Sequence, residues 1–270
     1  MKSAVTLAQV AEARAGPFVF HHSLPEGFAK ARSHGFDGVE LFLPEPDFIS
    51  SEETKALASR HDLLIAAVGT GAGMVRHGLS LTDPRASKRR EALDFILGMI
   101  DFGGRLGAPA ILGSMQGNWS GEVHRAQALE WLAQALRTAG KHAEHHGVCF
   151  LLEPLNRYET NLINGLTQGV RFIEEYKLEN IFLLADLFHM NIEETNLAQA
   201  ILEAGPQIGH VHFADSNRWA MGFGHTDPHP IVASLKQIGY KGFLSAEIFP
   251  LPDPETCAAQ QIEAIKICLA

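Results

Sequence analysis

The sequence contains little of what marks several large classes of protein. Only three of its 270 residues are cysteines, an odd number with no CxxC spacing, so we expect free thiols in a reducing cytoplasm. Lysine and arginine number 22 against 31 acidic residues, and the net charge of -9 argues against a nucleic-acid partner. No apolar run reaches the roughly 18 residues of a transmembrane helix, and polar residues interrupt the N-terminus before a signal-peptide core can form. The sequence therefore predicts a cytoplasmic globular protein that does not bind membranes.

The chain also shows no internal boundary. No linker rich in proline, glycine and serine divides it, and neither a block of like charges nor a low-complexity segment appears. Because an α/β barrel fills roughly 250 residues as one unit, we expect residues 1–270 to form a single domain.

Short apolar runs alternate with longer amphipathic stretches along the whole sequence. The short runs are typical of strands buried on both faces of a parallel sheet. They are Ala4–Leu7, Gly38–Phe42, Leu63–Val68, Ala108–Leu112, Val148–Glu153, Ile181–Asp186, Gly209–Phe213 and Phe243–Ile248. Helical spacing appears between them at Arg89–Phe102, Val123–Ala143, Leu166–Tyr176, Thr195–Glu203, Ile231–Ile238 and Glu255–Leu269. This alternation predicts a single (β/α)8 TIM barrel, and a doubly wound sheet is the competing fold.

The position of the first strand is ambiguous, because Pro17–Phe20 is as apolar as Ala4–Leu7. We place the strand at Ala4–Leu7. Ala8–Ser23 then becomes a long loop over the top of the barrel, where the C-terminal ends of the strands form the active face.

Residues able to bind a metal stand at the ends of the last four predicted strands. They are Glu153, Asp186, His212 and Glu247, separated by 33, 26 and 35 residues, each about one strand–helix unit. A lone acid at a strand end is often a helix cap or a surface ion-pair partner, but four on successive strands favour one shared site. Three crowded carboxylates repel one another, and a divalent cation reverses that cost. Three oxygen ligands and one imidazole, without a thiolate, favour Mn²⁺, Mg²⁺ or Co²⁺.

Several longer motifs resemble those of a known superfamily. EPLNRYET, ADLFHMNIEE, HVHFADSNRWAMGFGH and SAEIFPLP resemble the metal-binding motifs of the xylose-isomerase-like TIM barrels, in particular the branch of D-tagatose 3-epimerase and 5-keto-L-gluconate epimerase. The resemblance extends to Val68–Pro84, is strong from residue 148 onward and is weak before residue 60. It implies one divalent ion, usually Mn²⁺, bound by the four strand-end residues, and a homo-oligomer, dimer or tetramer.

The resemblance also implies roles for individual residues. Glu153 and Glu247 act as the acid/base pair, whereas Glu159, His189 and Arg218 hold substrate oxygens. The implied substrate is a ketohexose or a keto-sugar acid such as 5-keto-L-gluconate or D-tagaturonate. A metal acting as a Lewis acid stabilises the cis-enediolate formed when a proton leaves the carbon next to the ketone. One glutamate removes the C3 proton and the other returns it to the opposite face.

Other functions on this scaffold stay open. An aldose–ketose isomerase moves a proton between C1 and C2 with one base, and an inosose-type dehydratase expels a neighbouring hydroxyl. A DNA-repair endonuclease would need more histidine ligands and a basic groove, which the acidic chain does not favour. A sugar-binding barrel without catalysis would be suggested by loss of one of the two glutamates, and both are present.

Two further segments have simple interpretations. Gly69–Gly73 follows a strand but lacks the sixth-position glycine of a dinucleotide loop, because that residue is Met74, so we interpret it as a tight loop near the substrate. The histidines of the segment KHAEHHG (His142, His145 and His146) resemble the exposed C-terminal end of a helix, where a protonated ring suits the helix dipole, and we favour this interpretation over a metal role.

Some single residues remain candidates of lower rank. For Glu40 we expect a structural hydrogen bond rather than a substrate contact. Arg157 could meet the carboxylate of a sugar acid, although a surface position is the default expectation. His21 and His22 could roof the pocket, although surface or packing roles are favoured. Trp219 is equally compatible with packing and with ligand contact.

Overall fold

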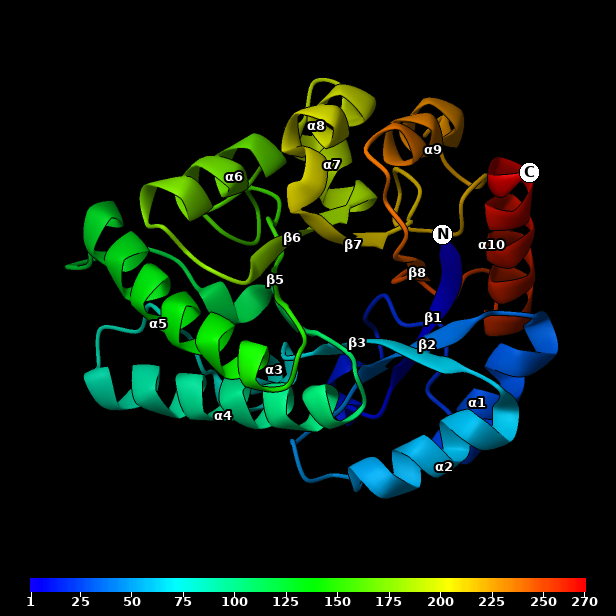
Figure 1. The fold of residues 1–270 in the computed structure, drawn as a ribbon, viewed down its shortest axis with the longest axis horizontal. Coiled ribbons are helices and arrows are strands. Elements are labelled where there is room, and N and C mark those ends of the chain that lie inside the picture. Colours follow the sequence, from blue (N-terminus) through cyan, green and yellow to red (C-terminus); the bar gives the residue numbers. More distant parts are fainter.

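The computed structural model describes residues 1–270 and forms a closed barrel of eight parallel strands in the order β1 to β8 (Figure 1). The strands are β1 (Lys2–Ala8), β2 (Gly38–Phe42), β3 (Leu64–Gly69), β4 (Ala110–Leu112), β5 (Phe150–Leu152), β6 (Ile181–Asp186), β7 (Ile208–His212) and β8 (Phe243–Ala246). Because β1 pairs with β8 as well as with β2, the sheet has no edge. The predicted TIM barrel is confirmed, and the doubly wound alternative is wrong.

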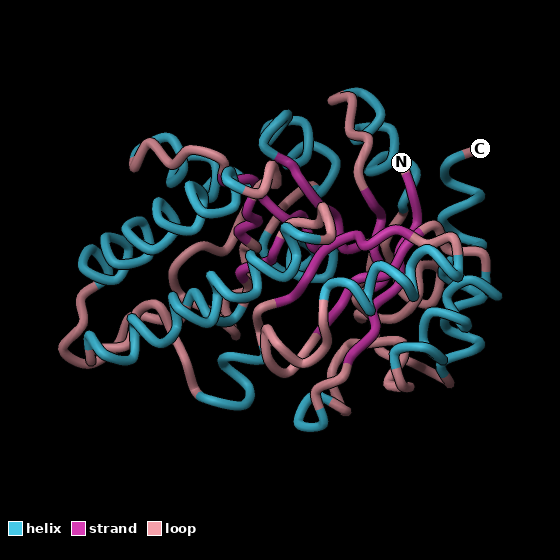
Figure 2. Tube along the Cα trace, turned by 60° about the horizontal axis from the view of Figure 1, so that its bottom comes forward, coloured by secondary structure: helices cyan, strands magenta, loops and turns pink.

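Ten helices surround the strands, which occupy the middle of the molecule in Figure 2. The helices are α1 (Leu24–His34), α2 (Ser51–His61), α3 (Ala72–His77), α4 (Ala86–Arg105), α5 (Arg125–His145), α6 (Leu166–Glu175), α7 (Leu187–Glu193), α8 (Leu197–Ala204), α9 (Pro228–Gln237) and α10 (Pro254–Leu269). None of them combines the length and apolar character needed to cross a membrane. Short 3-10 turns occur at η1 (Ala11–Ala13), η2 (Ser114–Gln116) and η3 (Gly205–Gln207).

The hydrophobic core lies mainly between the sheet and its helices, in one cluster of 74 buried residues. Helix α6 illustrates the packing: a side chain at Gly169 would lie 2.7 Å from Leu183 of β6, so glycine permits this close approach. A separate apolar cluster of only four buried residues joins neighbouring strands, namely Ala67, Ile111, Leu151 and Leu184. Side chains alternate along a strand, so Leu184 and Asp186 share the inner face of β6. The inside of the barrel is therefore apolar along β3 to β6 at this level, whereas Glu40 of β2 pairs with Ala67 and His210 of β7 pairs with Leu184, which places polar groups on the opposite side.

The observed elements differ from the predicted ones in several places. Strand β5 covers only Phe150–Leu152, so Val148–Glu153 was too long a prediction; Glu153 follows the strand directly. The alternative first strand at Pro17–Phe20 makes only an isolated bridge between Phe20 and Leu7. The apolar pattern does not predict α1, α2, α3 or α7. Helix α2 has few buried apolar side chains, but its capping box of Ser50 and Glu53 is a sequence signal for its start.

Candidate active site

Four side chains at the C-terminal ends of the strands converge on one spot. Glu153 follows β5, Asp186 and His212 end β6 and β7, and Glu247 follows β8. One ligand atom from each lies within 4.8 Å of the others. Nδ1 of His212 is 3.4 Å from Asp186 Oδ2, 3.5 Å from Glu153 Oε1 and 3.6 Å from Glu247 Oε2. The structure thus brings together the four residues that strand spacing singled out, and we call them the acidic cluster.

Glu40 of β2 determines how His212 faces the acidic cluster. Its Oε1 is 3.0 Å from Nε2 of His212, and its Oε2 is 2.8 Å from Nε2 of His210. Burial alone would raise the pKa of Glu40, but the two imidazoles hold that pKa well below its usual range, so Glu40 stays ionised. Because Nε2 donates to Glu40, Nδ1 is the nitrogen that His212 turns toward the cluster, and an ion that displaces the proton on Nδ1 would bind there, as in metal-binding histidines. The expected structural hydrogen bond of Glu40 is confirmed.

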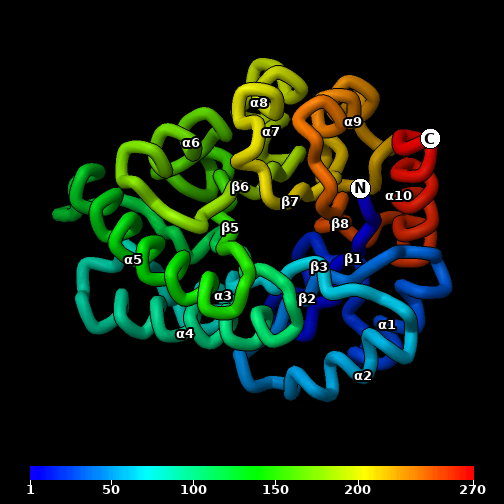
Figure 3. Tube along the Cα trace, viewed as in Figure 1, coloured from blue at the N-terminus to red at the C-terminus, as the bar shows by residue number.

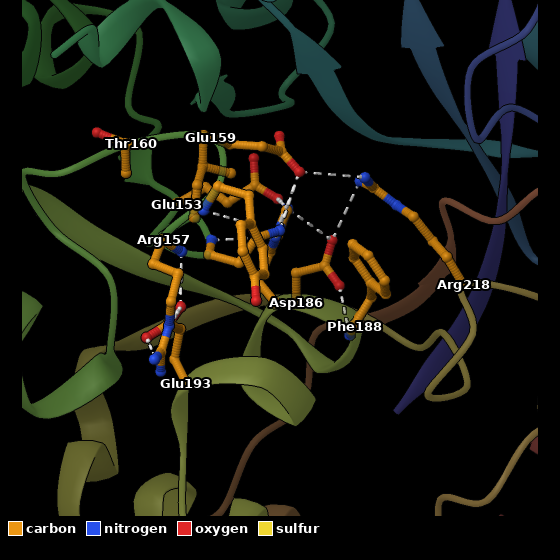
Figure 4. A network of polar contacts seen from close by, with 12 residues as sticks. Glu153, Arg157, Glu159, Thr160, Asp186, Phe188, Glu193 and Arg218 are labelled. Carbon is orange, nitrogen blue, oxygen red and sulfur yellow. Dashed lines mark hydrogen bonds and ion pairs between the residues drawn. The ribbon is translucent and has the colours of Figure 1, made fainter.

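Arg218 places a positive charge against the carboxylates. Its Nη2 contacts Glu247. Figure 4 shows the same side chain beside Asp186, where Nη2 lies 3.5 Å from Oδ2, and beside the ring of Phe188, over which the guanidinium packs. The backbone of Arg218 is left-handed, with a φ of 61°, which is uncommon for a residue other than glycine. Burial raises the pKa of Glu247 to about 7, against the opposing effect of Arg218 and His212. A glutamate with this pKa can gain and lose a proton near neutral pH.

His189 is held in one tautomer by Asn156, a residue that the sequence analysis missed. Its Nδ1 accepts from the backbone N–H of Asn156 at 3.2 Å and lies 2.8 Å from the side-chain amide of the same residue. The proton therefore sits on Nε2, which is buried, has no hydrogen-bond partner and lies 3.9 Å from Glu153 Oε1. The Asn156 amide also donates to Glu159 Oε1 at 3.0 Å. The motif around Glu159 thus positions both predicted substrate-binding groups, His189 and Glu159.

The acidic cluster fits a divalent cation. Glu153 Oε1 is buried without any hydrogen-bond partner, an arrangement that costs free energy unless a cation or donor meets it. Burial lowers the pKa of His212, but Glu40 and Glu247 more than reverse this and raise it well above the ordinary value. Carboxylate oxygens with a single imidazole nitrogen form a donor set suited to Mg²⁺, Mn²⁺ and related ions. The acidic cluster therefore has an excess of negative charge that a divalent cation would neutralise.

A cavity of about 310 Å³ opens beside the acidic cluster. Five of the seven predicted site residues line it, namely Glu153, Glu159, His189, Arg218 and Glu247. The loop after β1 contributes residues from Glu12 to Phe18, and Phe18 stacks on Phe42 with ring centroids 4.4 Å apart. Gly69, Thr70 and Gly71 complete part of the wall. The interpretations of Ala8–Ser23 as a cover and of the Gly69 segment as a loop near the pocket agree with this arrangement.

Several candidates of lower rank lie away from the cavity. Arg157 points away from the acidic cluster and pairs with Glu193, with Nε 2.9 Å from Oε1 and Nη2 3.0 Å from Oε2 (Figure 4). Trp219 packs edge-on against Phe223, with ring centroids 6.4 Å apart. Neither residue is among those lining the cavity, and the same is true of His21 and His22. All four residues therefore occupy packing or surface positions and do not line the cavity.

The sequence and the structure of the chain are both similar to those of known proteins. A profile described as Xylose isomerase-like TIM barrel matches residues 28–268. The L-ribulose 3-epimerase of Methylomonas sp. is 32% identical over 233 residues, covering 83% of this chain and 78% of that one. The 3-dehydro-D-guloside 4-epimerase of Escherichia coli is 39% identical over 116 residues, covering 43% and 44% of the two chains. The structure of D-allulose 3-epimerase from Methylomonas sp. with D-allulose gives a TM-score of 0.82 at 26% identity, covering 99% of this chain and 98% of that one.

The profile match begins within α1 and ends within α10, so it spans nearly the whole barrel. The relatives described above are all named as carbohydrate epimerases, in agreement with the resemblance of the four motifs. The chain belongs to the xylose isomerase-like TIM-barrel family.

Proposed function

We propose that the protein is a divalent-metal-dependent ketose 3-epimerase, an isomerase of carbohydrates. The observation that carries this proposal is the presence of two glutamates, Glu153 and Glu247, which follow different strands and both line the cavity. Epimerisation requires an acid/base group on each face of a planar intermediate, whereas an aldose–ketose isomerase can work with one. The names of the relatives support the epimerase over the isomerase and the inosose-type dehydratase.

Glu153 and Glu247 exchange protons with the substrate. One of them removes the proton from the carbon next to the ketone, and the other returns a proton to the opposite face. Without the ion, burial raises the pKa of Glu247 to about 7. A bound divalent ion would lower that pKa, so Glu247 would be ionised in the loaded protein and able to accept a proton from the substrate. Because Arg218 contacts Glu247, it also restricts the orientation of that carboxylate.

Two hydrogen-bond donors face the place where negative charge develops. Nε2–H of His189 is unpaired beside Glu153, and Arg218 lies 4.0 Å from Glu159 across the cavity wall. Preorganised donors of this kind stabilise the charge on a carbonyl oxygen as the neighbouring proton leaves. Glu159 lines the cavity, where it can orient a hydroxyl group of the sugar, and the Asn156 amide holds its carboxylate in place.

Glu153, Asp186, His212 and Glu247 would hold the ion, and we propose Mn²⁺ ahead of Mg²⁺ or Co²⁺. When bound, a divalent ion supplies positive charge that stabilises negative charge on the substrate oxygens. Glu40 keeps His212 oriented for this role through the Nε2 hydrogen bond.

The cavity lining favours an uncharged ketose over a keto-sugar acid or a sugar phosphate. Four glutamates line the cavity, and Arg218 is the sole lysine or arginine among the lining residues. That guanidinium already faces Glu247 and Asp186. Arg157, the other candidate for a substrate carboxylate, pairs with Glu193 outside the cavity. The carboxylate or phosphate of an anionic substrate would therefore meet glutamates and no unpaired cationic side chain, because the ion would be taken up by its own ligands and the ketose oxygens.

The reaction is tested by incubating the Mn²⁺-loaded protein with unphosphorylated ketoses in heavy water. We expect the C3 epimer, carrying one carbon-bound deuterium at the inverted centre. A product lighter by one water would refute the epimerase and support a dehydratase, and an aldose labelled at C2 would support an isomerase.

The acid/base assignment is tested by Glu247→Gln. We expect turnover to fall by at least about 100-fold, the lower range for general acid/base catalysis, while sugar binding changes much less. Glu193→Gln is the matched control, because Glu193 pairs with Arg157 outside the cavity. An active Glu247→Gln protein would show that the assignment is wrong.

A further inference from the structure

Three metal-ligating side chains converge on the outside of the barrel, where α4 and α5 lie side by side (Figure 3). Asp101 belongs to α4, His142 to the last turn of α5, and His146 directly follows that helix. Nε2 of His142 is 2.7 Å and Nε2 of His146 is 2.8 Å from the same atom, Asp101 Oδ1. The sequence shows the two histidines together, but the fold adds the carboxylate from 41 and 45 residues earlier in the chain.

The packing of the two helices fixes this arrangement. His142 and His146 are four residues apart and therefore lie on one face of the helix end. Gly104 of α4 approaches His146 so closely that an added Cβ would lie 2.5 Å from the Cβ and Cγ of the histidine. His146 cannot move toward α4, and its ring is held near Asp101 without any ion.

The site is open to solvent, unlike the acidic cluster. The side chains of His142, His146 and Asp101 are 31%, 25% and 38% exposed. An ion can therefore enter from outside, and water can occupy the coordination position that three protein ligands leave free.

We propose that Asp101, His142 and His146 form a second metal site that binds Zn²⁺ or a similar nitrogen-preferring ion. Two imidazoles and one carboxylate are the ligand types of tetrahedral zinc sites. The acidic cluster has the opposite composition, three carboxylates and one imidazole, which suits ions that prefer oxygen. The protein would thus carry two metal sites of different selectivity, and the outer one would link the C-terminal ends of α4 and α5.

The competing interpretation is a plain hydrogen-bonded trio, in which two neutral histidines donate to Asp101. Both interpretations explain the observed distances. Only the metal-site interpretation predicts that replacing one of the three residues lowers the number of bound ions. We therefore load the protein with Zn²⁺, remove loosely held ion by gel filtration, and count zinc atoms per chain for the native protein and its variants.

Asp101→Asn and His142→Gln should each hold one zinc fewer per chain than the native protein, whatever the acidic cluster retains. Their outer-site affinity should fall at least tenfold in a competition with a chromophoric chelator. His145→Gln is the matched control, because His145 neighbours the trio without belonging to it, and it should keep the native count. His146 is left intact because of its packing against Gly104, and circular dichroism checks that each variant is folded. Equal zinc counts in the native protein and in both folded variants would overturn the proposal.

Discussion

The hydrogen bond between Glu40 and His212 provides the sharpest test of how the acidic cluster binds its ion. Glu40→Gln keeps the size of the side chain but removes the charge that accepts from Nε2 of both His212 and His210. Glu40 is 4% exposed, so water cannot replace the lost acceptor. A hydrogen bond to a charged group contributes about 1.5–3 kcal/mol, and each 1.4 kcal/mol corresponds to about tenfold in an equilibrium constant. We therefore expect Mn²⁺ affinity to fall by about 10- to 100-fold, the range typical of residues that support a metal ligand.

Titration calorimetry with Mn²⁺ measures this loss directly, and activity at increasing Mn²⁺ shows whether saturation restores turnover. His210→Gln is the matched control, because it removes the other partner of Glu40 and leaves the bond to His212 intact. Its Mn²⁺ affinity should stay within a few-fold of the native value. Unchanged affinity in Glu40→Gln, or an equal loss in His210→Gln, would refute the reasoning that Glu40 acts through the orientation of His212.

Three further predictions follow from the site. Glu247 has a pKa of about 7 in the folded, ion-free protein, above the ordinary value of 4.5. The folded protein therefore binds a proton at Glu247 more tightly than the unfolded chain does. This protonation stabilises the fold at low pH, and the stabilisation is lost as the pH rises through 7. An ion must displace the proton, and calorimetry should show weaker Mn²⁺ binding with greater proton release at pH 6 than at pH 8; equal binding would contradict the raised pKa. Asn156→Ala removes the side-chain contact with His189 Nδ1 and should lower kcat/KM by about tenfold with little change in Mn²⁺ affinity, whereas loss of the ion would show that Asn156 supports the metal instead. Arg157→Ala breaks an exposed pair with Glu193 and should leave kcat/KM with uncharged ketoses unchanged; a large loss would place Arg157 in substrate binding.

The barrel could be predicted because its strands are buried on both faces and therefore appear as continuous apolar runs. Strands such as Ile181–Asp186 were located to the residue, since the run ends at a polar side chain. Helix α1 was missed although Leu24, Phe28 and Ala31 lie at helical spacing and Pro25 occupies the first turn, because the stripe is short and Gly27 interrupts it. Helix α2 buries only two apolar side chains, Leu57 and Ala58, so its apolar pattern is too weak to indicate a helix.

The acidic cluster could be predicted from the sequence for a different reason. In a barrel the C-terminal strand ends meet at one rim, so regular spacing alone places Glu153, Asp186, His212 and Glu247 together. The supporting groups have no such signal. Glu40 reaches His212 from 172 positions away across the inside of the barrel. Asn156 resembles an ordinary loop residue until its amide meets His189, 33 positions later.

The buried groups left without partners give a physical reason to regard this rim as a binding site. Folded proteins pair nearly all buried polar atoms, because an unpaired one costs about 1–3 kcal/mol. Glu153 Oε1, His189 Nε2 and Arg218 Nε are buried and unpaired, and all three residues line the same cavity. An acceptor and two donors left unpaired in residues that line one cavity destabilise the fold, and no contact within the protein offsets this. A divalent cation would supply positive charge to Glu153, and the oxygen atoms of a polyhydroxylated ketose would accept hydrogen bonds from His189 and Arg218. Together these two ligands would satisfy all three groups.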